Sequence, residues 1–151
     1  MVETVTDEAL RDEVRAWLAD NWKGLPKRNG GEGAGWTGSP EQKAWMAKVV
    51  EARWAVPRWA PEWSGRGLSN AQAKIIEREF AAVGAPGTGQ DRTNLWANTL
   101  LACGTEALKQ KLILPLLRQE VGMCLLYSEP GAGSDLAGIR TRADRQDDHF
   151  V

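Results

Sequence analysis

The segment with the strongest chemical signal is the loop SEPGAGSD, Ser128 to Asp135, which lies between two apolar stretches. Gly131 and Gly133 flank one alanine, so backbone amides can turn toward a ligand without obstruction by a Cβ. Ser128 and Ser134 add a hydroxyl at each end. Such a nest of amides and hydroxyls suits an anion or a heterocycle rich in acceptor atoms. Taken alone, the pattern also fits a purely structural turn, which is the commoner use of a Gly-rich loop.

The titratable residues near this loop do not form an independent catalytic group. Glu129 precedes Pro130, and we expect it to be a structural carboxylate that binds loop backbone or pairs with an arginine. We expect the same of Asp135. His149, the only histidine, falls in an alternating segment and is expected on the surface. The chain shows no His/Asp/Ser or His/Cys arrangement, so we expect neither a hydrolase nor a metal site.

Composition excludes several other classes. The net charge is −1, without a basic patch, which argues against a nucleic-acid partner. No apolar run approaches the roughly 18 residues of a membrane span, and the acidic start does not resemble a secretory signal. We therefore expect a cytoplasmic protein. Cys103 and Cys124 match neither a disulfide framework nor a zinc pattern, and we expect both to be small, half-buried apolar residues.

Helical signals occupy the first two thirds of the chain. Helices are expected over Asp7 to Trp22, after the capping residues Ser39 and Ser69, over Leu95 to Cys103, and from Glu106 to about Arg118. The spacing predicts a helical bundle whose mainly buried residues include Leu10, Val14, Trp17, Ile76, Phe80, Leu100, Leu101 and Leu112. Leu95 to Cys103 is apolar on nearly all sides, which predicts a central position in the bundle.

Tryptophan is unusually frequent, with eight residues against one Tyr and two Phe. Six lie in the middle of the chain: Trp36, Trp45, Trp54, Trp59, Trp63 and Trp96. A tryptophan cluster can stack on bases, but a nucleic-acid site also needs positive charge. We therefore expect these rings to fill contacts between helices or between subunits.

The character of the sequence changes after Glu120. A short apolar run, the Gly-rich loop and the alternating segment IRTRADRQDDHFV are typical of β structure. The predicted fold class is mainly α: a helical bundle over residues 1–120, then the first strands of a β domain over 121–151. A lone hairpin is marginal without further strands, so we expect more sequence or a partner chain to complete this domain.

The string YSEPGAGSDLAGIRTRA resembles the best-known signature of the acyl-CoA dehydrogenases. Three upstream segments agree with that family in the same order: RWAVPRWAPEWSGRGLS, EREFAAVGAPG and ACGTEALKQKLILPLL. The resemblance covers about Asp7 to Val151. It implies an amino-terminal helical domain, followed by the start of a middle β domain that carries the signature.

The resemblance also implies a function and a site. The family is flavin-dependent, uses FAD, and oxidises the CH–CH group of acyl-CoA thioesters. Ser128 would hydrogen-bond the pyrimidine side of the flavin ring, and Ser134 would approach the substrate near its CoA arm. Leu125 stands where several members carry an aromatic residue, and Ser128 where Thr is commoner. The residues expected to line the flavin are Leu125, Leu126, Tyr127, Ser128, Glu129, Pro130, Gly131, Ala132, Gly133 and Ser134.

The family's catalytic glutamate lies in its third domain, so we expect no catalytic residue within these 151 residues. The expected partners are an acyl-CoA substrate, an electron-transfer flavoprotein and other subunits of a homo- or hetero-oligomer. An oxidase that uses oxygen remains open. The alternative is a non-catalytic helical subunit, or relic of the family, that binds a partner through its Trp-rich face.

Overall fold

The structure is a computed structural model that describes residues 6–25, 38–125 and 128–151. The helices are α1 (Asp7–Asn21), α2 (Pro40–Glu51), α3 (Asn70–Ala82), α4 (Gln90–Thr93), α5 (Leu95–Cys103) and α6 (Glu106–Leu117). Two 3-10 turns, η1 (Pro61–Trp63) and η2 (Leu136–Gly138), and two strands, β1 (Arg145–Gln146) and β2 (His149–Phe150), complete the order. The predicted mainly α class is confirmed. The Gly-rich segment before Gly38 lies outside the described residues.

The helix starts follow the predicted caps. Thr6 accepts a hydrogen bond from the Ala9 amide, and Ser39 accepts one from Gln42. Ser69 and Gln72 form a reciprocal capping box at α3. A side-chain oxygen at this position satisfies an amide that the first helical turn leaves without a partner. α6 continues through Pro115 and ends at Leu117, close to its expected end at about Arg118.

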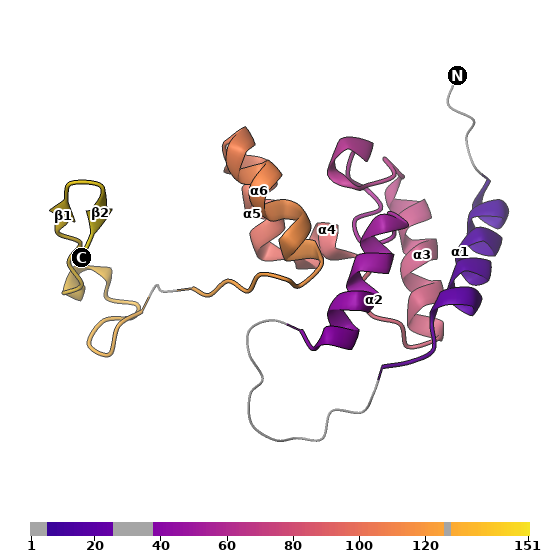
Figure 1. The fold of residues 1–151 in the computed structure, drawn as a ribbon, viewed down its shortest axis with the longest axis horizontal. Helices are drawn as coiled ribbons and strands as arrows, with labels where there is room; N and C mark the ends of the chain where they lie inside the picture. Colours follow the sequence, from indigo (N-terminus) through magenta and orange to yellow (C-terminus); the bar gives the residue numbers. More distant parts are fainter. Residues whose placement is uncertain (1–5, 26–37, 126–127) are drawn as a thin grey trace.

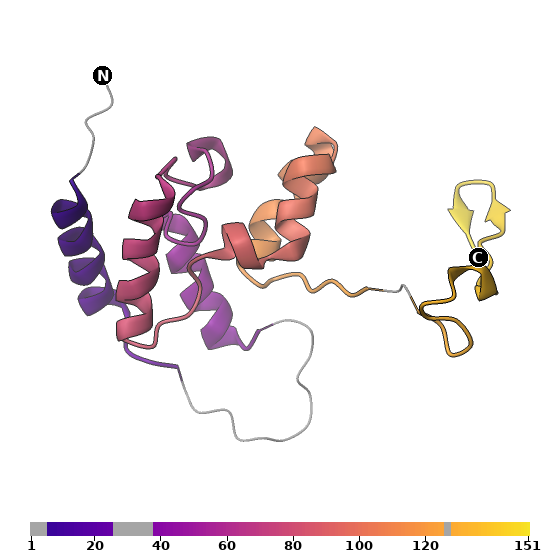
Figure 2. The same cartoon turned by 180° about the vertical axis from the view of Figure 1, so that it is seen from behind.

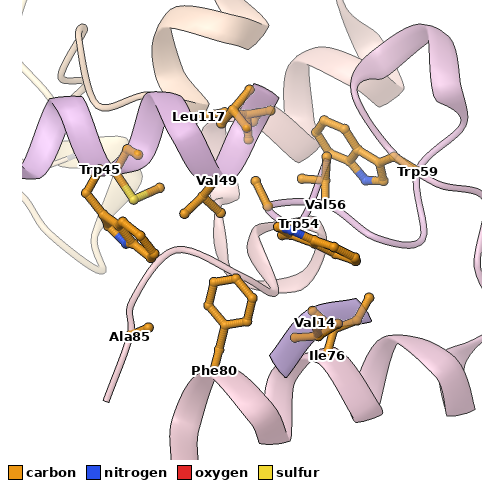
Figure 3. Packing of buried hydrophobic residues seen from close by; sticks show 14 of the residues in the cluster. Val14, Trp45, Val49, Trp54, Val56, Trp59, Ile76, Phe80, Ala85 and Leu117 are labelled. Carbon is orange, nitrogen blue, oxygen red and sulfur yellow. The ribbon is translucent and has the colours of Figure 1, made fainter. Parts of the chain in front are cut away.

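The core lies between α1, α2, α3 and the loop that follows α2. α1 and α3 run side by side in both views (Figures 1 and 2). Figure 3 shows Phe80, Val14 and Ile76 facing Trp54 and Val49 across this space. The predicted burial of Leu10, Val14, Ile76 and Phe80 is confirmed. Burying a side chain of this size stabilises the fold by about 1.5–3 kcal/mol relative to its exposed state.

The tryptophans bind the helices to each other, as predicted. Trp22 and Trp45 have ring centroids 4.6 Å apart, and Trp17 stacks on Phe80 at 6.0 Å. Trp45 donates its indole N–H to the carbonyl of Pro86 at 2.8 Å. Aromatic pairs of this geometry add about 0.5–1.5 kcal/mol beyond the burial of their area. Trp17 is only partly buried, and Trp36 lies outside the described residues.

The prediction that Leu95 to Cys103 is central was wrong. Ala97 is the buried residue of α5, Leu95 is 57% exposed, and Leu100 and Leu101 are half-buried. Leu112 of α6 is also only half-buried. The reason is that α5 packs mainly on α4 and α6 and reaches the core through Ala97 alone among its fully buried residues. Cys103 and Cys124 are exposed, which corrects their expected half-burial.

The β region contains one short antiparallel hairpin. Arg145 pairs with Phe150 and Gln146 with His149, around a turn in which Asp147 has a φ of 46°. His149 is exposed, as expected, and lies 3.0 Å from the carboxylate of Asp148. The alternating sequence therefore forms a tight hairpin rather than one long strand. The domain division after residue 120 stays a prediction. None of the helices in the described ranges is long and apolar enough to span a bilayer.

Candidate functional site

The loop Ser128–Ser134 is a tight turn closed by its own backbone. The amide of Glu129 donates to the carbonyl of Ala132 at 3.0 Å, and the amide of Ala132 donates back at 3.1 Å. Pro130 and Gly131 form the tip, and a Cβ built on Gly131 would meet open space. Ala132 is buried, but the glycines on either side of it are exposed. The turn therefore presents backbone to solvent around a small anchored residue.

Glu129 anchors this turn to the segment that follows. Its carboxylate accepts hydrogen bonds from the amides of Arg140 at 2.6 Å and Thr141 at 2.9 Å. The Thr141 hydroxyl donates a third, at 2.5 Å. The hydroxyl of Thr141 and the amide of Arg140 hold the pKa of Glu129 below its ordinary value, because they stabilise the charged form. Glu129 is thus a structural carboxylate, as predicted. Asp135 makes no side-chain cap bond at the start of η2, which differs from its expected role.

Ser128 and Ser134 are exposed at the two ends of the turn. Within the described ranges, neither hydroxyl has a hydrogen-bond partner. The amides of Gly133 and Ser134 likewise make no bond to another described residue. Free donors grouped on an exposed turn are what a ring with several acceptor atoms requires. The turn therefore offers several hydrogen-bond donors to a ligand with acceptor atoms.

The other residues that the sequence predicted to line a flavin differ in their exposure. Leu125 is exposed, as are Pro130, Gly131 and Gly133, while Glu129 is half-buried and Ala132 buried. Leu126 and Tyr127 lie outside the described residues. A cofactor pocket normally encloses most of its ligand. Most of this loop is exposed, so the loop does not enclose a ligand by itself.

A cavity of about 450 Å³ lies at the junction of α4 and α5, and the sequence analysis did not predict it. Every lining side chain is uncharged: Met46, Gly87, Thr88, Gln90, Thr93, Asn94, Leu95, Trp96 and Gln119. Gly87 has a φ of 113°, and a Cβ there would lie 2.9 Å from the sulfur of Met46. The sequence signal was the Gly-rich string GAPGTGQ before α4, since glycines at positive φ let the chain turn around a cavity.

The side-chain amide of Gln90, beside this cavity, forms hydrogen bonds to backbone carbonyls and to a neighbouring side chain. Gln90 donates to the carbonyls of Gly87 at 3.2 Å and Leu117 at 3.1 Å, and its side-chain oxygen accepts from Asn94 at 2.9 Å. A neutral lining in which the amides of Gln90 and Asn94 already have partners suits an uncharged ligand group rather than a phosphate. No group of three His, Cys, Asp or Glu residues in the described ranges could hold a metal ion.

Comparison with known proteins shows the same family throughout. Residues 4–120 match the family model for the acyl-CoA dehydrogenase, N-terminal domain. The acyl-CoA dehydrogenase IpdE1 of Mycobacterium tuberculosis is 38% identical over 153 residues, covering 95% of this chain and 38% of the relative. FadE26 of the same organism, also an acyl-CoA dehydrogenase, is 31% identical over 98% of this chain and 37% of its own length.

The solved structures agree with this assignment. The ChsE4–ChsE5 complex from Mycobacterium tuberculosis contains a chain with a TM-score of 0.59 and 28% identity, covering all of this chain and 38% of that one. The Tcur3481–Tcur3483 steroid acyl-CoA dehydrogenase gives a TM-score of 0.61 and 31% identity, over 99% of this chain and 38% of that one. The 151 residues thus span about two fifths of the length of these relatives. The chain belongs to the acyl-CoA dehydrogenase family, and it carries that family's amino-terminal helical domain.

Proposed function

We propose that this chain forms the amino-terminal part of a flavin-dependent enzyme that oxidises the CH–CH group of acyl-CoA thioesters. The observation that supports the proposal best is the turn Ser128–Ser134, which carries two partner-free hydroxyls and is anchored through Glu129. Leu125 to Ser134 would line the FAD. The bound flavin would accept hydride from the substrate, and the chain's own groups would hold and orient its ring.

Each serine of the turn has a separate role in this proposal. Ser128 would donate to the pyrimidine side of the flavin and favour electron density arriving on the reduced ring. Ser134 would contact the substrate near its CoA arm. Glu129 would keep the turn in shape, because its carboxylate is already occupied by three donors. The catalytic base would come from polypeptide outside these 151 residues, in the same chain or in a partner.

The wider assignments follow the family. We place the enzyme in the cytoplasm and in lipid or fatty-acid metabolism, with an electron-transfer flavoprotein as the acceptor. The two solved relatives above are described as two-component proteins, which supports a homo- or hetero-oligomer here.

The test uses Ser128→Ala and Ser134→Ala in the complete assembly, whether that is one longer chain or two. Ser128→Ala should weaken flavin retention, shift the flavin absorbance band and slow flavin reduction at saturating substrate. Ser134→Ala should mainly raise the substrate concentration for half-maximal rate, because a CoA contact acts in ground and transition states alike. Flavin content, absorbance and single-turnover reduction are measured beside a thermal melt.

Ser69→Ala is the matched control. It removes the α3 cap, which should lower stability by about 1 kcal/mol without changing the kinetics of the folded fraction. If both turn variants behave like this control, the turn is only structural, and the alternative of a non-catalytic partner-binding subunit is favoured.

A second test uses the 151-residue chain alone. We expect no turnover of acyl-CoA and weak flavin binding, since one exposed wall cannot enclose the cofactor. The measurements are flavin absorbance after desalting and bleaching on addition of an acyl-CoA. Stoichiometric flavin that bleaches with substrate would contradict this expectation.

A further inference from the structure

The helix α4 is only four residues long, yet it carries much of the wall of the neutral cavity. Gln90 and Thr93 of α4, with the following Asn94, line that cavity. A single turn has no intrinsic stability in water, so tertiary contacts must hold it. The amide of Gln90 donates to the carbonyl of Ala55 at 2.9 Å, and the hydroxyl of Thr88 donates to that of Trp54 at 2.7 Å. Both acceptor residues, Ala55 and Trp54, lie in the loop after α2.

The strongest contact of α4 is made by a charged residue outside the cavity lining. The side chain of Asp91 is only 1% exposed. Its carboxylate accepts a hydrogen bond from the backbone amide of Arg58 at 2.9 Å and another from the guanidinium of Arg58 at 3.1 Å. Hydrogen bonds to a charged group contribute about 1.5–3 kcal/mol, more than neutral ones. Asp91 thus connects α4 to the same loop that receives the Gln90 and Thr88 bonds.

The guanidinium of Arg58 is held on all its edges. One terminal nitrogen binds Glu77 of α3 at 2.8 Å, while Nε and the other terminal nitrogen bind the side-chain oxygen of Asn70 at 3.0 and 2.9 Å. Burial lowers the pKa of Arg58, but hydrogen bonds to Glu77 and Asp91 raise it by more, so the group stays charged. A planar donor held by three residues, Asn70, Glu77 and Asp91, has little freedom to move. It therefore gives Asp91 a rigid partner.

We propose that Arg58 and Asp91 are a positioning pair for the cavity, which set where α4 presents Gln90, Thr93 and Asn94. The pair also keeps the Asp91 carboxylate neutralised one residue away from a lining that is otherwise uncharged. An unpaired carboxylate this deeply buried would be strongly unfavourable. This inference concerns the cavity and does not depend on the flavin turn.

The test uses the 151-residue chain with Asp91→Asn and, as the matched control, Asn70→Ala. The control removes another acceptor that binds Arg58, on α3, but leaves the bond from Arg58 to α4. Glu77→Gln is not a suitable control, because Glu77 also binds Arg92 of α4 at 2.7 Å. Amide hydrogen exchange and ¹⁵N NMR follow the amides of Gln90 and Asn94 and the indole N–H of Trp96. Asp91→Asn should speed exchange at the two amides by about tenfold and shift the Trp96 resonance, while the indole resonances of Trp17 and Trp45 stay unchanged.

The control should leave α4 exchange within about twofold of the parent, since its loss lies on α3. Two results would overturn the proposal. The first is that the α4 amides of Asp91→Asn exchange at the parental rate. The second is that exchange of every core amide is accelerated equally, which would indicate a general loss of stability. If Asp91→Asn does not fold, Arg58→Lys is measured in the same way. It keeps the charge but loses the forked donors, and the same local pattern is expected.

Discussion

Glu129 illustrates how one residue of a functional motif can serve the motif without doing chemistry. Its position in the turn proposed to bind flavin suggests an acid or base, but three donors from Arg140 and Thr141 occupy its oxygens. A carboxylate in this state is a poor proton acceptor because protonation would break hydrogen bonds that favour the charge. The residue therefore acts on Ser128 and Ser134 indirectly, through the shape of the turn.

The order of this turn should depend on pH through Glu129. The folded pKa lies below the ordinary value of 4.5, so the carboxylate stabilises the turn fully above pH 4.5. That contribution is lost as the pH falls through the lower folded value. Glu129→Gln should remove the dependence and loosen residues 128–141 at neutral pH. NMR amide shifts and hydrogen exchange of Arg140 and Thr141, measured against pH, test this.

Glu120→Gln provides the control, because it removes one negative charge elsewhere on the surface. It should leave the Arg140 and Thr141 amides as they are in the parent. Unchanged exchange at these two amides in Glu129→Gln would show that the carboxylate does not hold the turn.

The segment from Pro57 to Leu68 is a loop whose shape is also fixed by hydrogen bonds to its own backbone. It folds back on itself: the amide of Gly67 donates to Trp59 and the amide of Leu68 to Pro57, at 2.8 and 3.0 Å. It also carries Arg58 to its place beside α4. A Cβ at Gly65 would lie 1.8 Å from the Trp59 carbonyl oxygen. Only glycine fits there.

Gly65→Ala should therefore destabilise the chain strongly, by about 3 kcal/mol or more, because backbone must move to accept the methyl group. Gly67→Ala is the matched comparison. Gly67 has a φ of 63° with open space around it, so alanine there should cost only about 1 kcal/mol from backbone strain. Urea denaturation of both variants checks the difference. Equal midpoints would contradict the close approach at Gly65.

The helical part of the molecule is well packed on one side and open on the other. The aromatic core binds α1, α2 and α3, whereas α5 and α6 leave large apolar side chains such as Leu95 and Leu108 exposed. Further apolar residues, Leu136, Ile139, Phe150 and Val151, are exposed in the β region. We expect these exposed apolar side chains to pack against other polypeptide.

The double variant Leu95→Gln/Leu108→Gln should reduce binding of a hydrophobic dye and self-association of the 151-residue chain. Both side chains are largely exposed, 57% and 43%, so the cost in stability should stay within about 0.5 kcal/mol per site. Dye fluorescence and analytical ultracentrifugation are the measurements. Val83→Gln, at 48% exposure on the end of α3, is the control and should change neither. If Val83→Gln reduces dye binding and self-association equally, these properties reflect the overall hydrophobicity of the surface and not Leu95 and Leu108 in particular.

Much of this fold could be predicted from sequence because its signals are local. Thr6, Ser39, Ser69 and Thr105 begin helices through bonds that span three residues, and the buried faces of α1 and α3 follow helical spacing. The family could be identified for a similar reason, since the string around SEPGAGSD is contiguous. The structural role of Glu129 was also predicted from its place before Pro130.

The burial of α5 and the position of the cavity depend on which elements pack together. Local sequence patterns do not predict that packing. The apolar composition of α5 predicted a central helix, but burial depends on neighbours, and α5 packs mainly against α4 and α6. The cavity depends on α4, a turn too short for any periodicity, placed by the distant partners Ala55, Arg58 and Leu117. By itself the sequence therefore determined the helices, their caps and the family, because hydrogen bonds and side-chain spacing within a few residues decide them. Only the tertiary structure decided the exposed face, the cavity and the charged pair beside it, because contacts between different elements create them, such as the bond between Arg58 and Asp91 across 33 residues.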